Sequence, residues 1–467
     1  MTRPGTEAQP LRVAIVGAGP AGFYATDQLF RTPGLVVEVD MYDRVPTPYG
    51  LVRAGVAPDH QKIKAVTAAF DKVAANPAFR FFGGVELGRH LSVDDLRAHY
   101  HMVLYTTGAQ TDRRMGIPGE DLQRSHAATE FVAWYNGHPD YRDLTFDLSQ
   151  ERAAVVGVGN VAADVARILS RTPEELAATD IADYALEALS ASRIREVYVL
   201  GRRGPAQAAF TNPEVRELGE LAGADVSAQP EEVEPDELTR QVLERAPDRA
   251  TQKKIEIIKE YARRTPTGKP RRLVMRFLVS PVELRDDGTG AVGGMRLVKN
   301  RLYATATGTL QPKATDQVED LPVGLVFRSV GYRGVPVPGV PFNDDWGVIL
   351  NAKGRVLDPQ TKHPLVGQYT AGWIKRGPTG VIGTNKPDAA ETVAGMIEDL
   401  ARDIHLRPAD PSPAAVERLI RERQPQYLSY QDWLRLDEIE TRRGRETGKP
   451  RVKFTRVKDM LAALGRA

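Results

Sequence analysis

Residues 11–22 read Leu-Arg-Val-Ala-Ile-Val-Gly-Ala-Gly-Pro-Ala-Gly, an apolar run that passes directly into three spaced glycines. A helical stretch follows from Phe23 to Phe30, and a second apolar run, Val36 to Tyr42, predicts the next strand. A Gly-x-Gly-x-x-Gly sequence between a strand and a helix is the turn of a dinucleotide-binding βαβ unit. This stretch therefore predicts an α/β fold with a parallel sheet.

Each residue of this turn has an expected role. Gly17 permits the tight turn, Gly19 lets a pyrophosphate approach the backbone, and Gly22 lets the helix pack close to the strand. Pro20 and Ala21 open the helix, whose free N–H groups and positive dipole end favour an anion. Asp43 lies just after the second strand, where an acid accepts hydrogen bonds from ribose hydroxyls and repels a 2′-phosphate. The alternative is a packing loop without a ligand.

A second unit repeats the pattern further along the chain. The strand Ala153–Val156 is followed by Gly157-Val158-Gly159-Asn160-Val161-Ala162 and a helix through Leu169, and Val197–Leu200 is its second strand. Alternation of strand and helix predicts a second parallel sheet.

The second unit differs from the first after its second strand. No acid closes that strand; Arg202 and Arg203 follow it instead. Guanidinium groups bind phosphate oxygens bidentately, so this pair suits a 2′-phosphate. The first site is therefore predicted to bind FAD and the second NADP(H). A solvated basic turn is the alternative for the two arginines.

Composition narrows the class of protein. A chain of 467 residues predicts two or three domains, and a formal net charge of +2 indicates no general partner. Cysteine is absent, which excludes thiol redox catalysis and thiolate-held iron–sulfur clusters in this chain. There is no apolar run long enough for a membrane span, and the polar start, Met1 to Pro10, does not suggest a targeting peptide. We expect a cytoplasmic protein with no metal ion, no nucleic-acid partner and no membrane partner.

The rest of the chain gives weaker signals. The segment around Asp286-Asp287-Gly288 predicts a turn between shorter strands, and Val366–Gly372 predicts one more buried strand. A helix is expected from about Pro387 to Leu400. Residues 405–414 are proline-rich and predict a linker, and we expect the helical tail beyond them to be anchored by Tyr430 and Trp433.

Several motifs follow one another along the chain: Pro46-Thr47-Pro48-Tyr49-Gly50-Leu51-Val52-Arg53 with Gly55-Val56-Ala57-Pro58-Asp59-His60, the second glycine run, Arg202-Arg203-Gly204, Phe210-Thr211-Asn212-Pro213-Glu214, and residues 371–383, Ala-Gly-Trp-Ile-Lys-Arg-Gly-Pro-Thr-Gly-Val-Ile-Gly. Together these motifs resemble the adrenodoxin reductase-like family of NADPH-dependent ferredoxin reductases. The resemblance implies two Rossmann-like domains of glutathione-reductase type, the NADP domain inserted into the FAD domain. The expected division is 1–108 and 331–467 for FAD and 109–330 for NADP, with crossings near Gly108 and Gly331.

The resemblance also implies site residues. Gly50, Leu51, Gly372 and Trp373 would lie at the FAD, as would the backbone of Gly380, Val381 and Ile382, with the helix near Pro387 directed at the flavin. Trp373 could instead be a plain core residue. His60 and Glu214 are the polar pair expected near the nicotinamide, as positioning residues; a purely structural loop histidine is the alternative, and no general acid or base is needed for hydride transfer.

The implied activity is transfer of a hydride from NADPH to FAD and then of single electrons to a ferredoxin-type iron–sulfur protein. A flavin-dependent monooxygenase and a non-catalytic NADP(H) sensor are alternatives. Residues 249–276 hold ten lysines and arginines against two glutamates, and an acidic partner would be attracted to them, with Lys253, Lys254 and Arg264 as candidates. A solvated helix face is the other interpretation of this segment.

Overall fold

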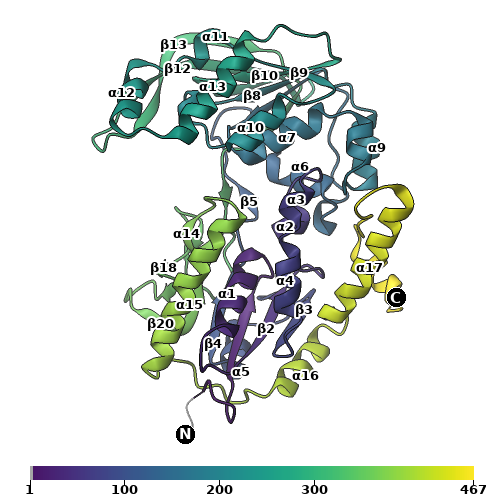
Figure 1. Cartoon of the computed structure of the whole chain (residues 1–467), viewed down its shortest axis with the longest axis vertical. Helices are drawn as coiled ribbons and strands as arrows, with labels where there is room; N and C mark the ends of the chain where they lie inside the picture. The colour runs from purple at the N-terminus through teal and green to yellow at the C-terminus, as the bar shows by residue number, and fades with distance from the viewer. Residues whose placement is uncertain (1–3, 467) are drawn as a thin grey trace.

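The computed structural model describes residues 4–466, which form two α/β units joined by a narrow crossing (Figure 1). Both ends of the chain build one unit, here called the terminal unit, and the middle of the chain builds the other, the inserted unit. The chain crosses between them at β5 (Thr111–Asp112) and β15 (Tyr332–Arg333), which pair antiparallel. The predicted fold class is confirmed.

The terminal unit contains a seven-stranded sheet. Its spatial order is β18 (Asn351–Ala352), β19 (Arg355–Leu357), β20 (Pro364–Thr370), β4 (Met102–Tyr105), β1 (Leu11–Val16), β2 (Val37–Asp43) and β3 (Phe79–Gly83). The strands from β20 to β3 are parallel, with Leu11 opposite Val37 and Val13 opposite Met102. Every residue of β1 is buried, as a strand covered on both faces requires.

Helices and short strands complete the terminal unit. They are α1 (Pro20–Phe30), α2 (Leu51–Ala54), α3 (Gln61–Lys64), α4 (Thr67–Ala74), α5 (Val93–His99), α14 (Trp373–Arg376), the 3₁₀ turn η3 (Ile382–Thr384), α15 (Asn385–Ala401), β16 (Phe342–Asn343) and β17 (Val348–Ile349). Helices α1 and α15 lie side by side over one face of the sheet, where Phe23, Ala25, Ala389 and Met396 join the same buried cluster.

The inserted unit contains a six-stranded parallel sheet. Its order is β6 (Ser125–Ala127), β14 (Leu325–Arg328), β7 (Arg152–Val156), β8 (Glu196–Leu200), β10 (Arg271–Arg276) and β9 (Ala224–Ala228). Its helices are α6 (Ala128–Tyr135), η1 (Pro139–Tyr141), α7 (Asn160–Ser170), α8 (Pro173–Ala177), α9 (Asp183–Ser190), η2 (Pro205–Gln207), α10 (Asn212–Leu218), α11 (Pro230–Val233), α12 (Glu237–Arg245) and α13 (Arg249–Arg263).

An antiparallel sheet of three strands covers one face of the inserted unit. It consists of β11 (Val279–Asp286), β12 (Val292–Ala304) and β13 (Leu310–Leu321), and the turn falls at Asp287–Ala291 as expected. The expectation of shorter strands was wrong, because β12 has 13 residues and β13 has 12. One end of this sheet packs its apolar residues on the six-stranded sheet, while much of β13 is exposed and polar. The apolar residues that predict a strand are therefore missing from the far ends of these strands, so their length could not be seen in the sequence.

The C-terminal segment lies along the outside of both units in Figure 1. It contains α16 (Pro413–Arg423), α17 (Tyr430–Thr447) and α18 (Val457–Ala463). Tyr430 and Trp433 are buried in the core of the terminal unit, which confirms that the tail is anchored there. Among the described residues, no helix is both long enough and apolar enough to cross a membrane.

Candidate functional site

One large cavity lies between the two units and reaches both glycine loops. Its volume is about 1930 Å³. Pockets for one small molecule usually measure about 300–1,000 Å³, so this cavity has room for two extended nucleotides. Every predicted site residue lines it except Gly22, Ala162 and Gly372, which lie behind its wall.

The first loop has the shape that a bound pyrophosphate needs. Gly17 has φ +111°, and a Cβ there would lie 2.5 Å from the carbonyl oxygen of Thr106, so only glycine fits. At Gly19, in contrast, a Cβ would meet no atom of the described residues within 4 Å. Gly50 borders the same space, since its own Cβ position lies 3.1 Å from the Cα of Gly19. The backbone is therefore bare at the start of α1, where an anion would be stabilised.

Gly22 acts in packing. A Cβ on it would lie 2.5 Å from the carbonyl oxygen of Gly17, which is why α1 can begin so close to β1. Asp43 lies at the end of β2, where its two carboxylate oxygens accept hydrogen bonds from the N–H groups of Ala18 (2.8 Å) and Val45 (2.9 Å). Burial raises the pKa of Asp43 in spite of these bonds. Each oxygen keeps a free lone pair for a hydroxyl donor.

The second loop repeats this geometry. Gly157 has φ +137°, and a Cβ there would lie 2.1 Å from the carbonyl oxygen of Ser329, while a Cβ at Gly159 would meet no described atom within 4 Å. The side chain of Asn160 accepts a hydrogen bond of 2.9 Å from the N–H of Thr211 and so ties the loop to the start of α10. Val161 lines the cavity, and Ala162 is fully buried against the sheet.

Arg202 and Arg203 follow β8 and line the cavity. Among residues 4–466 neither guanidinium has an ion-pair partner. Burial, and next the charge of Arg202, lowers the pKa of Arg203. A bound anion would offset the repulsion between these two positive charges and would therefore bind here favourably.

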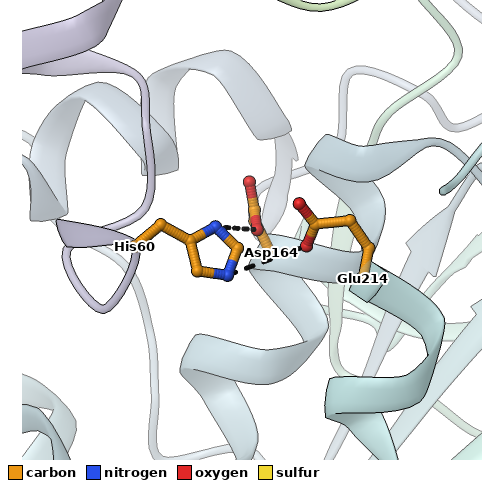
Figure 2. Close-up of side chains that lie close together, drawn as sticks. All are labelled: His60, Asp164 and Glu214. Carbon is orange, nitrogen blue, oxygen red and sulfur yellow. Dashed lines mark ion pairs between the residues drawn. The ribbon is translucent and has the colours of Figure 1, made fainter. Parts of the chain in front are cut away.

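His60 meets the inserted unit at a cluster of charged residues (Figure 2). Its Nε2 lies 3.8 Å from Glu214 Oε2 and 2.7 Å from Glu217 Oε2, and its Nδ1 lies 3.9 Å from Asp164 Oδ1. In Figure 2 the imidazole reaches from its loop toward the carboxylates of α7 and α10. The structure thus brings together His60 and Glu214, which are 154 positions apart.

Arg167 binds this cluster from within α7. Its side chain is fully buried and contacts Asp164 (2.6 Å), Glu214 (3.2 Å) and Asp59, the neighbour of His60 (2.7 Å). Ligand atoms of His60, Asp164 and Glu214 lie within 4.8 Å of one another, but the positive charge among them is the guanidinium of Arg167.

The pKa values of this cluster differ from those of free side chains. Burial, and next the charge of Asp164, raises the pKa of Glu214 to about 7, against the opposing charges of His60 and Arg167. Burial also raises the pKa of Asp164. For Asp59 burial is outweighed by Arg167, which lowers the pKa. Glu214 can therefore change its charge near neutral pH.

Sequence reasoning missed Asp164, Arg167 and Glu217. Asp164 and Arg167 lie in the apolar run Val161–Leu169, and two charged residues three positions apart inside a buried helix are a signal that they pair.

Trp373 forms the wall of the cavity beside the crossing. Its ring lies 5.4 Å from the ring of Tyr332, and its indole N–H donates to the carbonyl of Thr379 (3.2 Å). The loop that follows brings Gly380, Val381 and Ile382 to the cavity, and α15 starts at Asn385, two residues earlier than expected. Gly372 lies behind Trp373 and donates its N–H to Asp388 in the first turn of α15 (2.5 Å). Leu51, the first residue of α2, also lines the cavity.

Most cations of residues 249–276 are already engaged, which the sequence did not show. Arg276 is buried between Glu232 and Glu319; Lys253, Lys259, Arg264 and Arg272 pair with Glu256, Glu234, Glu260 and Glu196; and Lys254, Lys269 and Arg271 donate to backbone carbonyls. Arg249 and Arg263 are exposed and have no such partner in the described chain. The local positive field is thus weaker than the residue count implies.

The chain is similar in sequence and in fold to known oxidoreductases. The model of the pyridine nucleotide-disulphide oxidoreductase family matches residues 11–204. The chain is 45% identical over 457 residues to the NADPH-ferredoxin reductase FprA of Mycobacterium leprae, covering 96% of this chain and 97% of that one. It is 40% identical over 475 residues to the mitochondrial NADPH:adrenodoxin oxidoreductase of Arabidopsis thaliana, covering 98% and 96%. The solved structure of Mycobacterium tuberculosis FprA in complex with NADPH matches with a TM-score of 0.91 and 44% identity, over 98% of this chain and 100% of that chain.

Proposed function

Because the chain belongs to the family of NADPH-ferredoxin reductases that includes FprA and adrenodoxin reductase, we propose that it passes electrons from NADPH, through FAD, to a ferredoxin-type iron–sulfur protein. The observation that carries this proposal is the pair of glycine loops that open onto one cavity. Two dinucleotides bound there would have their reactive rings in the same space.

The residues present fit the two cofactors. The bare backbone at Gly19 and Gly159 gives each pyrophosphate a place at a helix start. Asp43 would hold the ribose of FAD, and the unpaired Arg202 and Arg203 would hold the 2′-phosphate of NADP(H). The chain has no cysteine, so the disulphide chemistry in the name of the matching family model has no counterpart among its residues.

When bound, FAD would accept a hydride from NADPH and release electrons singly. The chain's own residues would hold the rings in place. Trp373 and the backbone of residues 380–382 would line the flavin from the terminal unit, with Gly50 and Leu51 opposite. His60 and Glu214 would position the nicotinamide, and Arg167 would keep Glu214 in place through its buried ion pair. Neither His60 nor Glu214 needs to move a proton in this reaction.

The activity is tested with the purified, FAD-loaded protein. NADPH added without oxygen should bleach the flavin absorbance, and a ferredoxin added next should be reduced. A protein that binds NADPH but never bleaches would be a sensor. One that consumes oxygen together with a hydroxylated substrate, and leaves ferredoxin oxidised, would be a monooxygenase.

We also propose that the ferredoxin docks on a basic surface of this protein. What supports it is α13 with the residue that follows it: Lys253 and Arg264 are exposed and form ion pairs only with Glu256 and Glu260 of that helix, although Arg264 also donates to the carbonyl of Gly219, and Arg249 and Arg263 are exposed as well. Pairing at the surface leaves a helix with more positive than negative charge, and this would attract an acidic ferredoxin. Lys254 is half-buried and donates to the carbonyl of Ala208, so it contributes less at the surface.

The docking surface is tested by charge reversal of Lys253, Lys254 and Arg264 to glutamate. At low salt the variant should have a several-fold higher KM for ferredoxin, with small-dye reduction near wild type, and the gap should close as salt is raised. Lys254→Glu is also made alone, because it contacts the loop before α10. Arg418→Glu, at an exposed residue of α16 at the far end of the molecule, is the control. Normal ferredoxin kinetics in the triple variant would place docking elsewhere.

A further inference from the structure

Outside the His60 cluster, the ion pairs that the described residues form between the two units all have the same polarity. The terminal unit and C-terminal segment contribute cations and the inserted unit contributes aspartates. The pairs are Arg44 with Asp140, Lys64 and Lys453 with Asp180, Lys449 with Asp183, and Arg456 with Asp143. Figure 1 shows the C-terminal segment beside the inserted unit, where α17 approaches α9.

Asp180 is the most buried acid of this interface. It is 2% exposed and receives two ammonium groups: Lys64 Nζ lies 2.7 and 2.8 Å from its oxygens, and Lys453 Nζ lies 3.2 Å away. The Lys453 ammonium also donates to the carbonyls of Asn136 (3.1 Å) and Arg53 (3.3 Å). A single lysine thus contacts oxygens from both units.

These contacts lie directly behind the cavity. Arg53 and Asn136 both line it, and α3, which ends at Lys64, begins immediately after His60. Fixing Lys64 on Asp180 therefore fixes His60 relative to the inserted unit, which carries Glu214. It adds a second link between the two predicted nicotinamide residues, beside the pairs that His60 and Asp59 form with Glu217 and Arg167.

Stability alone is a poor explanation for such a cluster. Burying two ammonium groups and a carboxylate costs solvation free energy, and well-packed apolar residues often serve as well or better. In some proteins, directed ion pairs serve instead to fix the geometry between the parts that they join. That geometry matters here, because hydride transfer needs the two rings at near contact distance and a displacement of about 1 Å can cost about 100-fold in rate.

We propose that Asp180, Lys64 and Lys453 are positioning residues that fix the inserted unit over the terminal unit for hydride transfer between the nucleotides. The C-terminal segment then has a role in catalysis, because it supplies Lys453 as the second lysine that binds Asp180; without this segment, Asp180 would be bound by Lys64 alone. This inference rests on the proposed function. None of the three residues contacts a reacting atom; they act through α3 and the loop that carries His60.

The test separates the two halves of the catalytic cycle in the FAD-loaded full chain. Lys453→Met and Lys64→Met keep the length of each side chain and remove its charge. We expect the single-turnover rate of flavin reduction by NADPH to fall at least tenfold in both. FAD content, the Kd for NADP⁺, and the rate at which dithionite-reduced protein reduces ferredoxin should stay within about twofold of wild type. Lys64→Met is the milder change and serves if Lys453→Met does not fold, because Lys64 is the more exposed of the two lysines.

Lys458→Met, at an exposed residue of α18 in the same segment, is the matched control. A variant in which both halves of the cycle slow equally, or in which FAD is lost, would show a general structural role and overturn the inference. So would wild-type rates of flavin reduction in Lys64→Met and Lys453→Met. Failure of the wild-type protein to be reduced by NADPH would instead refute the proposed function.

Discussion

Replacing Arg203 by alanine should change which nicotinamide nucleotide the protein uses. Arg203 is partly buried at the cavity wall, and neither it nor Arg202 has an ion-pair partner in the described chain, so the change breaks no internal ion pair. A charge-assisted hydrogen bond to a phosphate contributes about 1.5–3 kcal/mol. Loss of one such contact corresponds to about tenfold to about 150-fold in kcat/KM for NADPH.

Arg202 is more exposed, so its replacement alone should cost closer to tenfold, and the double variant less than the product because both groups bind one phosphate. The assay compares kcat/KM for NADPH and NADH with a small dye as electron acceptor, which keeps ferredoxin docking out of the measurement. NADH, which lacks the 2′-phosphate, should lose little. Arg193→Ala, exposed on the same unit and away from the cavity, is the control. Equal losses for NADPH and NADH would refute the assignment of both arginines.

Two further changes test the cavity. Gly19→Val and Gly159→Val each place a side chain in open space at an ordinary negative φ, so both should fold; the first should be colourless for lack of FAD, and the second yellow but not reduced by NADPH. If either kept its nucleotide at wild-type affinity, the corresponding loop would not be the pyrophosphate site. Glu214→Gln tests the raised pKa: ionised Glu214 should favour the cationic oxidised nicotinamide, so the Kd ratio of NADPH to NADP⁺ should rise as pH passes about 7 in the wild type and stay flat in the variant. The pKa of Glu214 in the folded protein lies above its ordinary 4.5, so Glu214 adds to the free energy of unfolding below pH 4.5, and this contribution is lost as the pH rises to about 7. In urea unfolding, the Glu214→Gln variant should not show this loss.

The features that sequence predicted well are those set by neighbours along the chain. Gly17 and Gly157 take φ +111° and +137°, values that favour glycine, and the strand, turn and helix around each of them are contiguous in the chain. The strand β20 ends at Thr370, before the expected Gly372, because Gly372 takes φ +81° and starts a new turn. Such differences of one or two residues do not move the site.

The features that sequence missed depend on partners far away in the chain. Arg167 is a charged residue in an apolar helix, and its meaning appears only when Asp59, 108 positions earlier, is placed beside it. The basic run 249–276 was interpreted from its count of charges. Its residues Lys259, Arg272 and Arg276 are paired with Glu234, Glu196 and Glu319, none of which belongs to that run.

The same pairing explains why a net charge of +2 says little about how salt should affect this protein. Cations of the inserted unit are largely paired within that unit, whereas Arg44, Lys64, Lys449, Lys453 and Arg456 are used across the interface. Salt should therefore affect the exposed charges and the buried interface charges to different degrees. It screens exposed charges on α13 within about 10 Å at 0.1 M and should slow ferredoxin reduction first. The Asp180 cluster is buried and screened far less, so flavin reduction by NADPH should stay nearly constant over the same range of salt. If both half-reactions slowed in parallel, the interface would be open to solvent in solution and the buried cluster could not be what sets the geometry of the two units.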